Sequence, residues 1–258
     1  MPRGARKISE TKIYHCILRG INKQDIFLDE QDYIKFTKEI RNTKEFFSYK
    51  LYSYVLMSNH IHLHIKDEQN KISKIMQSLQ VRYTSYFNKK YNRVGHLFQN
   101  RFQSKCVEND FYNLNLIRYI HQNPIKAGIS QIENYYWSSY LEYISNNSKD
   151  LIEKNEILKL FSKNKNLAIL KFIKFNNEIL YLQQGKDILE YEIKTKLNDA
   201  EVIECIRRKL KINNIEEIQN YENNTRKECI RKVKEIEGCT YSQLSRILGI
   251  NIKVIQRA

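Results

Sequence analysis

Hydrophobic and polar positions alternate in several short segments near the start of the chain. The segments that predict strands are residues 12–19, 48–57, 60–66 and 103–107; the first is rich in β-branched and aromatic residues, and the second and third alternate. Residues 32–47 and 72–91 instead carry apolar residues at helical spacing. A third helix is predicted from Asp110, as its N-cap, to Asn123, because Pro124 would end it.

The predicted order of elements is β-α-β-β-α-β-α, and its first six elements match the ferredoxin-like split βαβ arrangement. We therefore predict an α+β domain whose antiparallel sheet has helices on one face and an open second face. Open faces of this kind often bind single-stranded nucleic acid. The composition shifts after the aromatic patch 135–143, and residues 145–150 are rich in turn formers. We predict a first domain over 1–145, a helical linker region over 146–200 and a helical domain over 201–258.

The formal net charge of +15 over 258 residues favours a polyanionic partner, most often nucleic acid. The alternative is a basic protein whose host simply favours Lys, Ile and Asn codons. The five cysteines form no C-x-x-C pair, which argues against a zinc site or a disulfide framework. No stretch approaches the roughly 20 apolar residues of a membrane span. We expect a cytoplasmic protein with no membrane contact.

The strand 60–66 carries His60, His62 and His64 at alternate positions, so their side chains share one face of the sheet. Two imidazoles at i and i+2 on a rigid strand suit a divalent ion that takes further oxygen ligands. The alternative is a polar sheet face without a metal.

A second motif, RYIHQNP over 118–124, lies at the end of the third predicted helix. Tyr119 and Asn123 are one helical turn apart and share a face. A tyrosine oxygen can attack phosphorus if a metal or base activates it, and the amide oxygen can complete a metal site. The alternative is a core tyrosine with Asn123 as a C-terminal cap.

Two further segments suit nucleic acid. Residues 91–102 interleave arginine with aromatic side chains, which fits a phosphate backbone and stacked bases. Residues 241–257 read as two short helices joined at Gly249, the pattern of a helix-turn-helix unit. Its second helix would present Asn251, Lys253, Gln256 and Arg257 to duplex DNA. A surface loop and a generic helical hairpin are the respective alternatives.

Six motifs occur in register over about residues 1–145. They are MPRGAR at the start, YHCILRGINKQDIF at 14–27, YVLMSNHIHLHI at 54–65, GHLFQNRF at 95–102, RYIHQNPIKAG at 118–128 and WSSY at 137–140. Together they resemble the single-tyrosine HUH transposases, most closely their REP-associated tyrosine transposase branch.

This resemblance implies a ferredoxin-like or palm-like catalytic domain. It implies that His60 and His62 ligate Mg²⁺ or Mn²⁺, that Asn123 is the third ligand and that Tyr119 is the nucleophile. His64 stands where the family has an apolar residue, and its role stays open between a further ligand and a neutral residue of the face. The C-terminal region matches the family only loosely.

The resemblance also implies a reaction and its partners. The enzyme would cleave and rejoin single-stranded DNA at hairpin-bearing element ends through a 5′-phosphotyrosine. Related transposases are dimers, and the sequence leaves the oligomeric state open. Candidate residues for gripping the strand are Arg19, Arg82, Arg93, Arg101 and Arg118. Two other readings remain: a catalytically silent DNA-binding regulator on the same fold, and a metal-dependent hydrolase without a covalent tyrosine.

Overall fold

The computed structural model describes residues 6–145, 150–178, 199–210, 212, 214–215, 217–234, 236 and 239–257. Residues 1–5 of the first motif and residues 179–198 of the predicted linker region lie outside these ranges. The chain divides into two compact units, residues 1–188 and 189–258. Each unit is described by itself.

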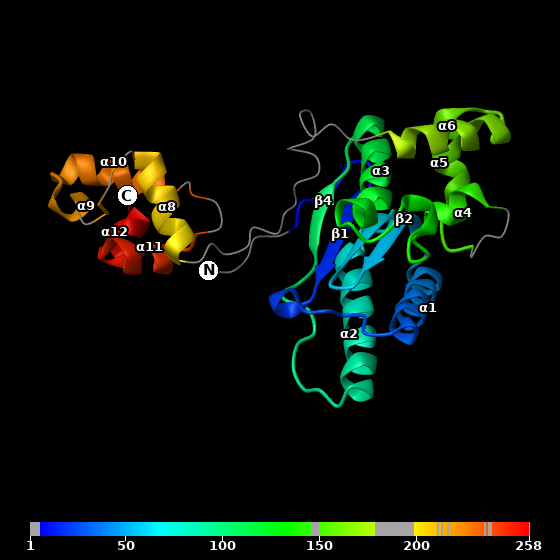
Figure 1. Ribbon diagram of the computed structural model, residues 1–258, viewed down its shortest axis with the longest axis horizontal. Coiled ribbons are helices and arrows are strands. Elements are labelled where there is room, and N and C mark those ends of the chain that lie inside the picture. Colours follow the sequence, from blue (N-terminus) through cyan, green and yellow to red (C-terminus); the bar gives the residue numbers. More distant parts are fainter. Residues whose placement is uncertain are drawn as a thin grey trace. The chain divides into compact units, whose positions relative to one another are not determined.

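The first unit begins with the predicted order of elements (Figure 1). These are β1 (Ile13–Arg19), η1 (Ile21–Lys23), α1 (Glu30–Phe47), β2 (Lys50–Met57), β3 (His60–Lys66), α2 (Ile72–Lys90), β4 (Gln103–Cys106) and α3 (Asp110–Lys126). The strands form one sheet in the order β2-β3-β1-β4, and each neighbouring pair is antiparallel. The predicted α+β class and split βαβ arrangement are therefore confirmed.

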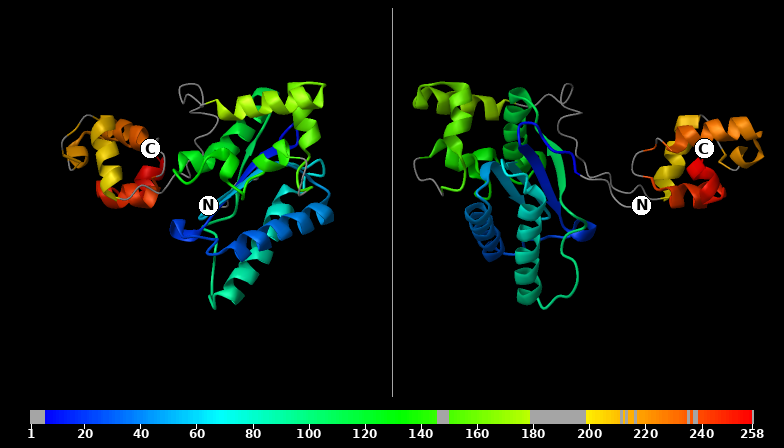
Figure 2. Two further views of the ribbon diagram at one scale, coloured as in Figure 1. Left: turned by 45° about the vertical axis from the view of Figure 1, so that its right-hand side comes forward. Right: turned by 180° about the vertical axis from the view of Figure 1, so that it is seen from behind.

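One face of the sheet is apolar and packs against α1 and α2, which lie together on that side in Figure 2. Every second residue of β3 (Ile61, Leu63 and Ile65) contributes to this core and is fully buried. The helices add Phe36, Ile40, Ile75, Met76, Leu79 and Tyr83. Burying side chains of this size stabilises the fold by about 1.5–3 kcal/mol each.

The second face is not open, so that expectation is wrong. Helix α3 lies across it, and Leu116 and Ile120 of α3 pack against Val55 and Met57 of β2. The strand pattern could not show this, because the cover comes from an element about 50 residues further along the chain. The histidines of this face are consequently buried rather than solvated: His62 is 3 % exposed and His64 fully buried.

Both predicted ends of α3 need correction. Its N-cap is Asn109, whose Oδ1 accepts from the Tyr112 N–H at 2.8 Å, and Asp110 lies in the first turn. Pro124 does not end the helix but lies inside its last turn. A proline there removes only one backbone donor, and the helix closes when the Ala127 N–H donates to the Asn123 carbonyl at 3.0 Å. Asn123 is thus a helical residue and not a C-terminal cap.

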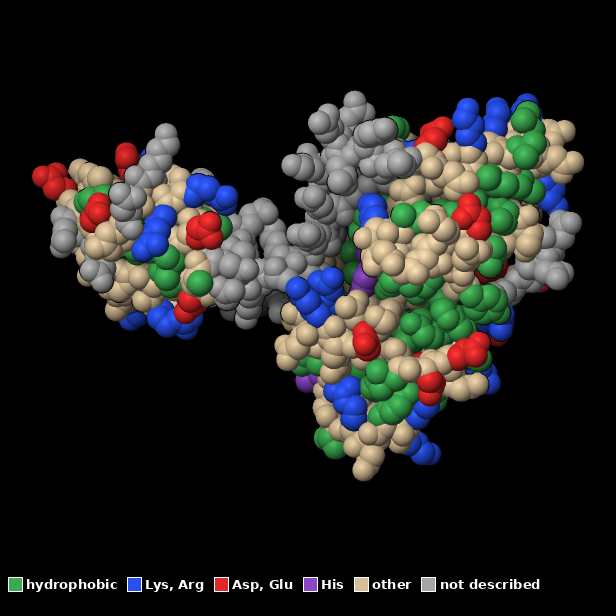
Figure 3. All heavy atoms as spheres, viewed as in Figure 1, with side chains coloured by type: hydrophobic (Ala, Val, Ile, Leu, Met, Phe, Trp, Pro, Cys, Tyr) green, Lys and Arg blue, Asp and Glu red, His purple; other side chains and the backbone are tan. Residues whose placement is uncertain are grey.

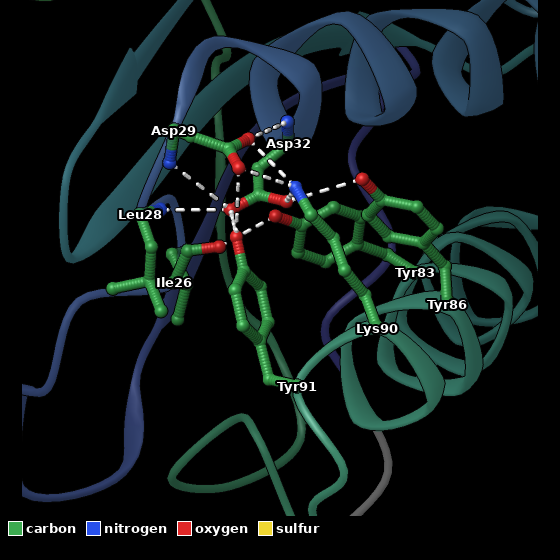
Figure 4. A network of polar contacts seen from close by, with 8 residues as sticks. All are labelled: Ile26, Leu28, Asp29, Asp32, Tyr83, Tyr86, Lys90 and Tyr91. Atoms are coloured by element: carbon green, nitrogen blue, oxygen red, sulfur yellow. Dashed lines mark hydrogen bonds and ion pairs between the residues drawn. The ribbon is translucent and has the colours of Figure 1, made fainter.

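A polar network joins the start of α1 to the end of α2 (Figure 4). Lys90 Nζ lies 2.7 Å from Asp29 Oδ1 and 2.8 Å from Asp32 Oδ1, and the Tyr91 hydroxyl donates to Asp32 at 2.8 Å. Asp32 is fully buried. Burial raises the pKa of its carboxyl, but hydrogen bonds from Lys90 and the Leu28 N–H outweigh this, and the pKa lies below its usual range. The network fixes the point from which the basic-aromatic loop 91–102 leaves α2.

The segment after 145 belongs to the first unit. It contains α5 (Lys154–Phe161) and α6 (Lys165–Asn177). Two short elements precede it, η2 (Ile132–Asn134) and α4 (Tyr140–Ile144). Phe172 of α6 is fully buried and stacks on Tyr143 of α4 with ring centroids 4.3 Å apart. The boundary of the compact unit therefore lies later than the predicted one near 145, because α5 and α6 share the main core.

The second unit is helical and has its own core. Its elements are α8 (Asp199–Leu210), α9 (Glu217–Asn220), α10 (Asn223–Lys234), α11 (Tyr241–Leu248) and α12 (Ile252–Arg257). Thr240 caps α11 by accepting from the Gln243 N–H at 3.1 Å. Gly249 ends it with φ +63, and a Cβ there would collide with the Gln219 side chain. The left-handed φ of this turn therefore favours glycine between α11 and α12.

None of the helices within the described ranges combines the length and the apolar composition needed to cross a membrane.

Candidate active site

The predicted ligand pair lies at the start of β3, directly after the turn at Ser58 and Asn59. His60 is half-buried and His62 is almost completely buried. The sheet register places His60 opposite Arg19 of β1 and His62 opposite Ile17. Two paired strands on either side of β3 therefore hold both imidazoles in fixed positions.

In both His60 and Asn123, one polar atom of the side chain takes part in a local hydrogen bond and the other does not. Asn59 Oδ1 lies 2.6 Å from His60 Nδ1 and accepts its proton, which leaves the Nε2 lone pair. Asn123 Nδ2 donates to the Tyr119 carbonyl at 2.8 Å, which leaves Oδ1. The Asn123 side chain lies close enough to His60 to raise the pKa of its imidazole, against the stronger lowering by burial. An imidazole nitrogen beside an amide oxygen fits a cation.

His62 is oriented by a second imidazole from the neighbouring strand. His15 of β1 is 2 % exposed, and its Nε2 lies 2.8 Å from His62 Nδ1. The two rings stack at a centroid distance of 5.1 Å and an interplanar angle of 24°. Since Nδ1 is engaged, Nε2 is the nitrogen of His62 left for a ligand.

Tyr119 lies over the same two rings. Its half-buried phenol is edge-on to His62 at a centroid distance of 5.5 Å and to His15 at 6.0 Å. Lys126, two turns later on α3, places Nζ 4.4 Å from the centroid of the Tyr119 ring. The structure thus brings Tyr119, His60, His62 and Asn123 together within one chain.

Burial and neighbouring cations keep the site histidines neutral. Burial lowers the pKa of His15 and that of His60, to about 3 and about 4 respectively. The pKa of His62 lies well below its usual value for the same reason, and the positive charges of Arg19 and Lys126 lower it further. Neutral imidazoles are the form that ligates metals, and the cations suit an incoming phosphate.

The helix that carries Tyr119 is anchored on its other side to α6. His121 Nδ1 lies 2.9 Å from Asn176 Oδ1, and its Nε2 lies 2.8 Å from Ser139 Oγ. Gln122 Nε2 donates to the Asn176 carbonyl at 2.8 Å. Two consecutive buried residues of the RYIHQNP motif therefore hold α3 in place, while Tyr119 and Asn123 face the sheet.

His64 lies in the same row of the sheet as His15 and is fully buried. Its nearest polar partner is Ser53 Oγ, 3.5 Å from Nδ1, and its Nε2 has no hydrogen-bond partner among the described residues. Its ring lies edge to face with the Tyr52 ring at a centroid distance of 5.4 Å. His64 therefore does not belong to the cluster of ring contacts that joins Tyr119, His15, His60 and His62.

The five predicted DNA-gripping arginines occupy different environments. Arg19 is half-buried beside His60, and Arg101 is exposed. Arg82 is exposed on α2 and lies 3.8 Å from a Glu39 oxygen, while Arg93 donates to Gln24 Oε1 at 3.2 Å. Arg118 packs on the Phe175 ring at 4.2 Å and donates to Asn115 Oδ1. DNA binding by these residues stays a prediction, and Arg118 has an evident structural role.

In the second unit, Asn251, Lys253 and Gln256 are exposed along α12 and the residue before it. Asn251 Oδ1 accepts from the Lys253 N–H at 2.9 Å, so its side chain also starts the helix. Arg257 lies in α12, and its side chain is outside the described part of the chain. Contact of this helix with duplex DNA stays a prediction.

Sequence reasoning missed His15 and Lys126. Both carry a recognisable signal: His15 has the strand parity of Ile17 and Arg19, and Lys126 is seven residues from Tyr119 on the same helical face. Within the described ranges no group of three or more His, Cys, Asp or Glu side chains is arranged to hold a metal. On the face that Figure 3 shows, histidine forms only small patches.

No curated protein matches the chain. One similar solved structure is a "REP associates tyrosine transposase bound to a REP hairpin", with 16% identity, a TM-score of 0.49, and coverage of 58% of this chain and 90% of that one. Another is a putative transposase from Deinococcus radiodurans R1, with 15% identity, a TM-score of 0.34, and coverage of 46% and 96%. Both TM-scores lie below 0.5, so neither likeness establishes a fold by itself.

The family described as "Transposase IS200 like" matches residues 9–123. The match begins before β1 and ends at Asn123, and it includes the sheet, the His60–His62 pair and Tyr119. Residues 9–123 of this chain are therefore similar to the IS200-like transposases.

Proposed function

We propose that this protein is a metal-dependent, single-tyrosine HUH transposase of the REP-associated branch. It would cleave and rejoin single-stranded DNA at hairpin-bearing element ends through a 5′-phosphotyrosine. The observation that supports this most is the contact of the Tyr119 ring on α3 with His62 on β3, beside His60, at centroid distances of 5.5 and 5.1 Å.

The proposed metal ligands are His60, His62 and Asn123, with Mg²⁺ or Mn²⁺ as the ion. The donor set fits such an ion because His60 Nε2, His62 Nε2 and Asn123 Oδ1 are the atoms that the local hydrogen bonds leave over, and imidazole nitrogens and amide oxygens both bind divalent ions. When bound, the ion would polarise the scissile phosphate and neutralise the charge that builds up on it.

Tyr119 would attack the phosphorus. A bond forms between its phenolic oxygen and phosphorus, and the bond to the 3′-oxygen breaks to leave a free 3′-hydroxyl. Lys126 is suitably placed to stabilise the phenolate, since its ammonium lies against the Tyr119 ring. The step exchanges one phosphodiester for another, the phosphotyrosine, so a 3′-hydroxyl can reverse it without another energy source.

The first test is formation of a covalent adduct. Unmodified protein, given Mg²⁺ or Mn²⁺ and a labelled hairpin oligonucleotide from the DNA flanking this gene, should form a complex that survives denaturing electrophoresis. Tyr119→Phe should bind the hairpin and form no adduct. Tyr112→Phe is the matched control, because it makes the same change two turns earlier on α3.

Each outcome separates the candidate functions. Cleavage by Tyr119→Phe at the level of the unmodified protein would support a hydrolase without a covalent tyrosine. Hairpin binding without any cleavage by the unmodified protein would support a catalytically silent regulator. An adduct that persists in Tyr119→Phe and disappears in Tyr112→Phe would move the nucleophile to another residue.

Binding of the strand by basic side chains predicts a salt dependence. The proposed contacts are Arg19, Arg82, Arg93 and Arg101, with Arg118 and the cations at the site adding charge. If about five phosphates are neutralised, log K should fall with log salt with a slope of roughly −3.5 for single strands. A flat response would remove the arginines from the proposal and leave the nucleophile untouched.

Two further partners stay proposals. Duplex DNA would bind the exposed side chains of α12, and deletion of residues 241–258 should then weaken duplex binding while the adduct with hairpin DNA persists. A homodimer is the other, and sedimentation velocity of the full chain measures it. Tyr119 lies beside the histidines of its own chain, so the adduct does not require a second copy.

A further inference from the structure

We propose that His15 is a positioning residue of the metal site, which fixes the tautomer and orientation of His62 so that His62 Nε2 faces the ion. The inference rests on the proposed function, because it concerns the ligand that this function assigns to His62. His15 itself would touch neither metal nor DNA.

The contact between the two imidazoles is built into the sheet. His15 lies on β1 opposite His64, one row away from His62, and its ring reaches diagonally to His62. The Nε2–Nδ1 distance is 2.8 Å, and both residues are at most 3 % exposed. Water has little access to either ring, so the two nitrogens satisfy each other.

Hydrogen-bond chemistry then decides which nitrogen of His62 is available. A hydrogen bond between two neutral imidazoles contains a single proton, so one ring donates its N–H and the other accepts through an unprotonated nitrogen. If His62 Nδ1–H donates to His15 Nε2, the lone pair of His62 Nε2 is free for a ligand. In the opposite arrangement His62 would carry its proton on Nε2 and could not ligate through it. A histidine ligand is commonly oriented by such a partner at its second nitrogen.

The two histidine ligands would thus be oriented in the same way, each by a different side chain that accepts the proton on its Nδ1. The proton on His60 Nδ1 is accepted by Asn59 Oδ1 at 2.6 Å, and that on His62 Nδ1 by His15 Nε2. His64, on the same strand, has only the 3.5 Å contact with Ser53. The strand therefore carries two oriented histidines and one that is not oriented in this way.

The test is Mn²⁺ affinity without DNA, measured from the electron paramagnetic resonance signal of free Mn²⁺. His15→Phe keeps a flat ring and removes the acceptor, and it should weaken Mn²⁺ binding by about 10–100-fold. In His15→Gln the amide oxygen can replace Nε2 as acceptor, and most of the affinity should return. His64→Phe is the matched control on the same buried face and should bind within a few-fold of the unmodified protein.

The outcomes distinguish this proposal from the one it rests on. If His62→Ala binds Mn²⁺ as the unmodified protein does, the metal site is wrong. If His62→Ala loses binding while His15→Phe retains it, the metal site stands and the role of His15 is wrong. Equal losses in His15→Phe and His64→Phe would show a general disturbance of the face and would also overturn the role of His15.

A measurement on the unmodified protein covers the case in which His15→Phe does not fold. Long-range ¹H–¹⁵N spectra of the histidine rings report which nitrogen carries the proton. We expect His62 to be protonated on Nδ1 and His15 to be unprotonated on Nε2. The reverse pair of tautomers would overturn the proposal.

Discussion

The two faces of the sheet are both buried, yet they hold different chemistry. On one face Ile61, Leu63 and Ile65 pack into the core beneath α1 and α2, and on the other His62 and His64 lie beneath α3. A strand that alternates in this way usually has one wet face. Here the polar alternation marks a second buried layer, in which burial keeps the imidazoles neutral and suited to metal ligation.

The largest expected effect of this difference is a loss of stability in acid. Burial lowers the pKa of His15 to about 3 and the pKa values of His60 and His121 to about 4, and it holds those of His62 and His64 well below their usual value. Below about pH 6.5 the unfolded chain therefore binds protons that the folded chain cannot, so the free energy of unfolding falls as pH falls from about 6.5 toward 4.

At pH 5 each deeply buried histidine would cost about 2 kcal/mol, and several together approach the whole stability of a typical domain. Urea unfolding in the presence of a chelator, at pH 7.5 and pH 5, measures the change. An unfolding free energy that is the same at both pH values would contradict the burial of the histidine face.

The apolar face should respond to truncation and not to pH. Leu63 is fully buried between β2 and β1, and Leu63→Ala should lower the free energy of unfolding by about 2–5 kcal/mol. The loss relative to the unmodified protein should be similar at pH 7.5 and pH 6, because no ionisable group is removed. Val94→Ala, at a position 98 % exposed, is the control and should stay within about 0.5 kcal/mol.

Sequence patterns predicted the parts of this arrangement that depend on local periodicity. The alternation in 60–66 placed the three histidines on one face, and the one-turn spacing placed Tyr119 beside Asn123. They could not predict the cover over the histidine face, because packing of α3 on the sheet joins residues far apart in the chain. For the same reason the His15–His62 contact and the anchoring of α3 by Asn176 became visible only in three dimensions.

The network beside the apolar core sharpens the comparison, because it is charged and should lose its contribution only at a lower pH than the histidine face does. Lys90→Met removes the ammonium from the buried Asp32 carboxylate and should lower the free energy of unfolding by about 1–3 kcal/mol near neutral pH. The pKa of Asp32 lies below its usual value, so this contribution is present above about pH 4 and is lost as pH falls further.

Urea unfolding of Lys90→Met at pH 7 and pH 5.5 tests this assignment, because Asp32 stays ionised over that range and the loss should be equal at both pH values. The exposed neighbour Lys89→Met is the matched control and should change stability little at either pH. A loss in Lys90→Met that grows as the solution becomes more acidic would mean that Asp32 is not the partner that matters.

The smallest effect at neutral pH is expected for His64→Leu, and it addresses the histidine face directly. His64 is fully buried, has one long contact with Ser53 and leaves Nε2 without a hydrogen-bond partner among the described residues. Replacing such a group by an apolar one of similar size is often neutral or stabilising. We therefore expect the free energy of unfolding to change by less than about 1 kcal/mol at pH 7. At pH 5 the variant should be more stable than the unmodified protein, because one depressed histidine pKa no longer opposes folding. A loss above about 2 kcal/mol at pH 7 would instead show that Nε2 has a strong partner, such as a buried water. His64 would then take part in a buried hydrogen bond, as His15 and His62 do.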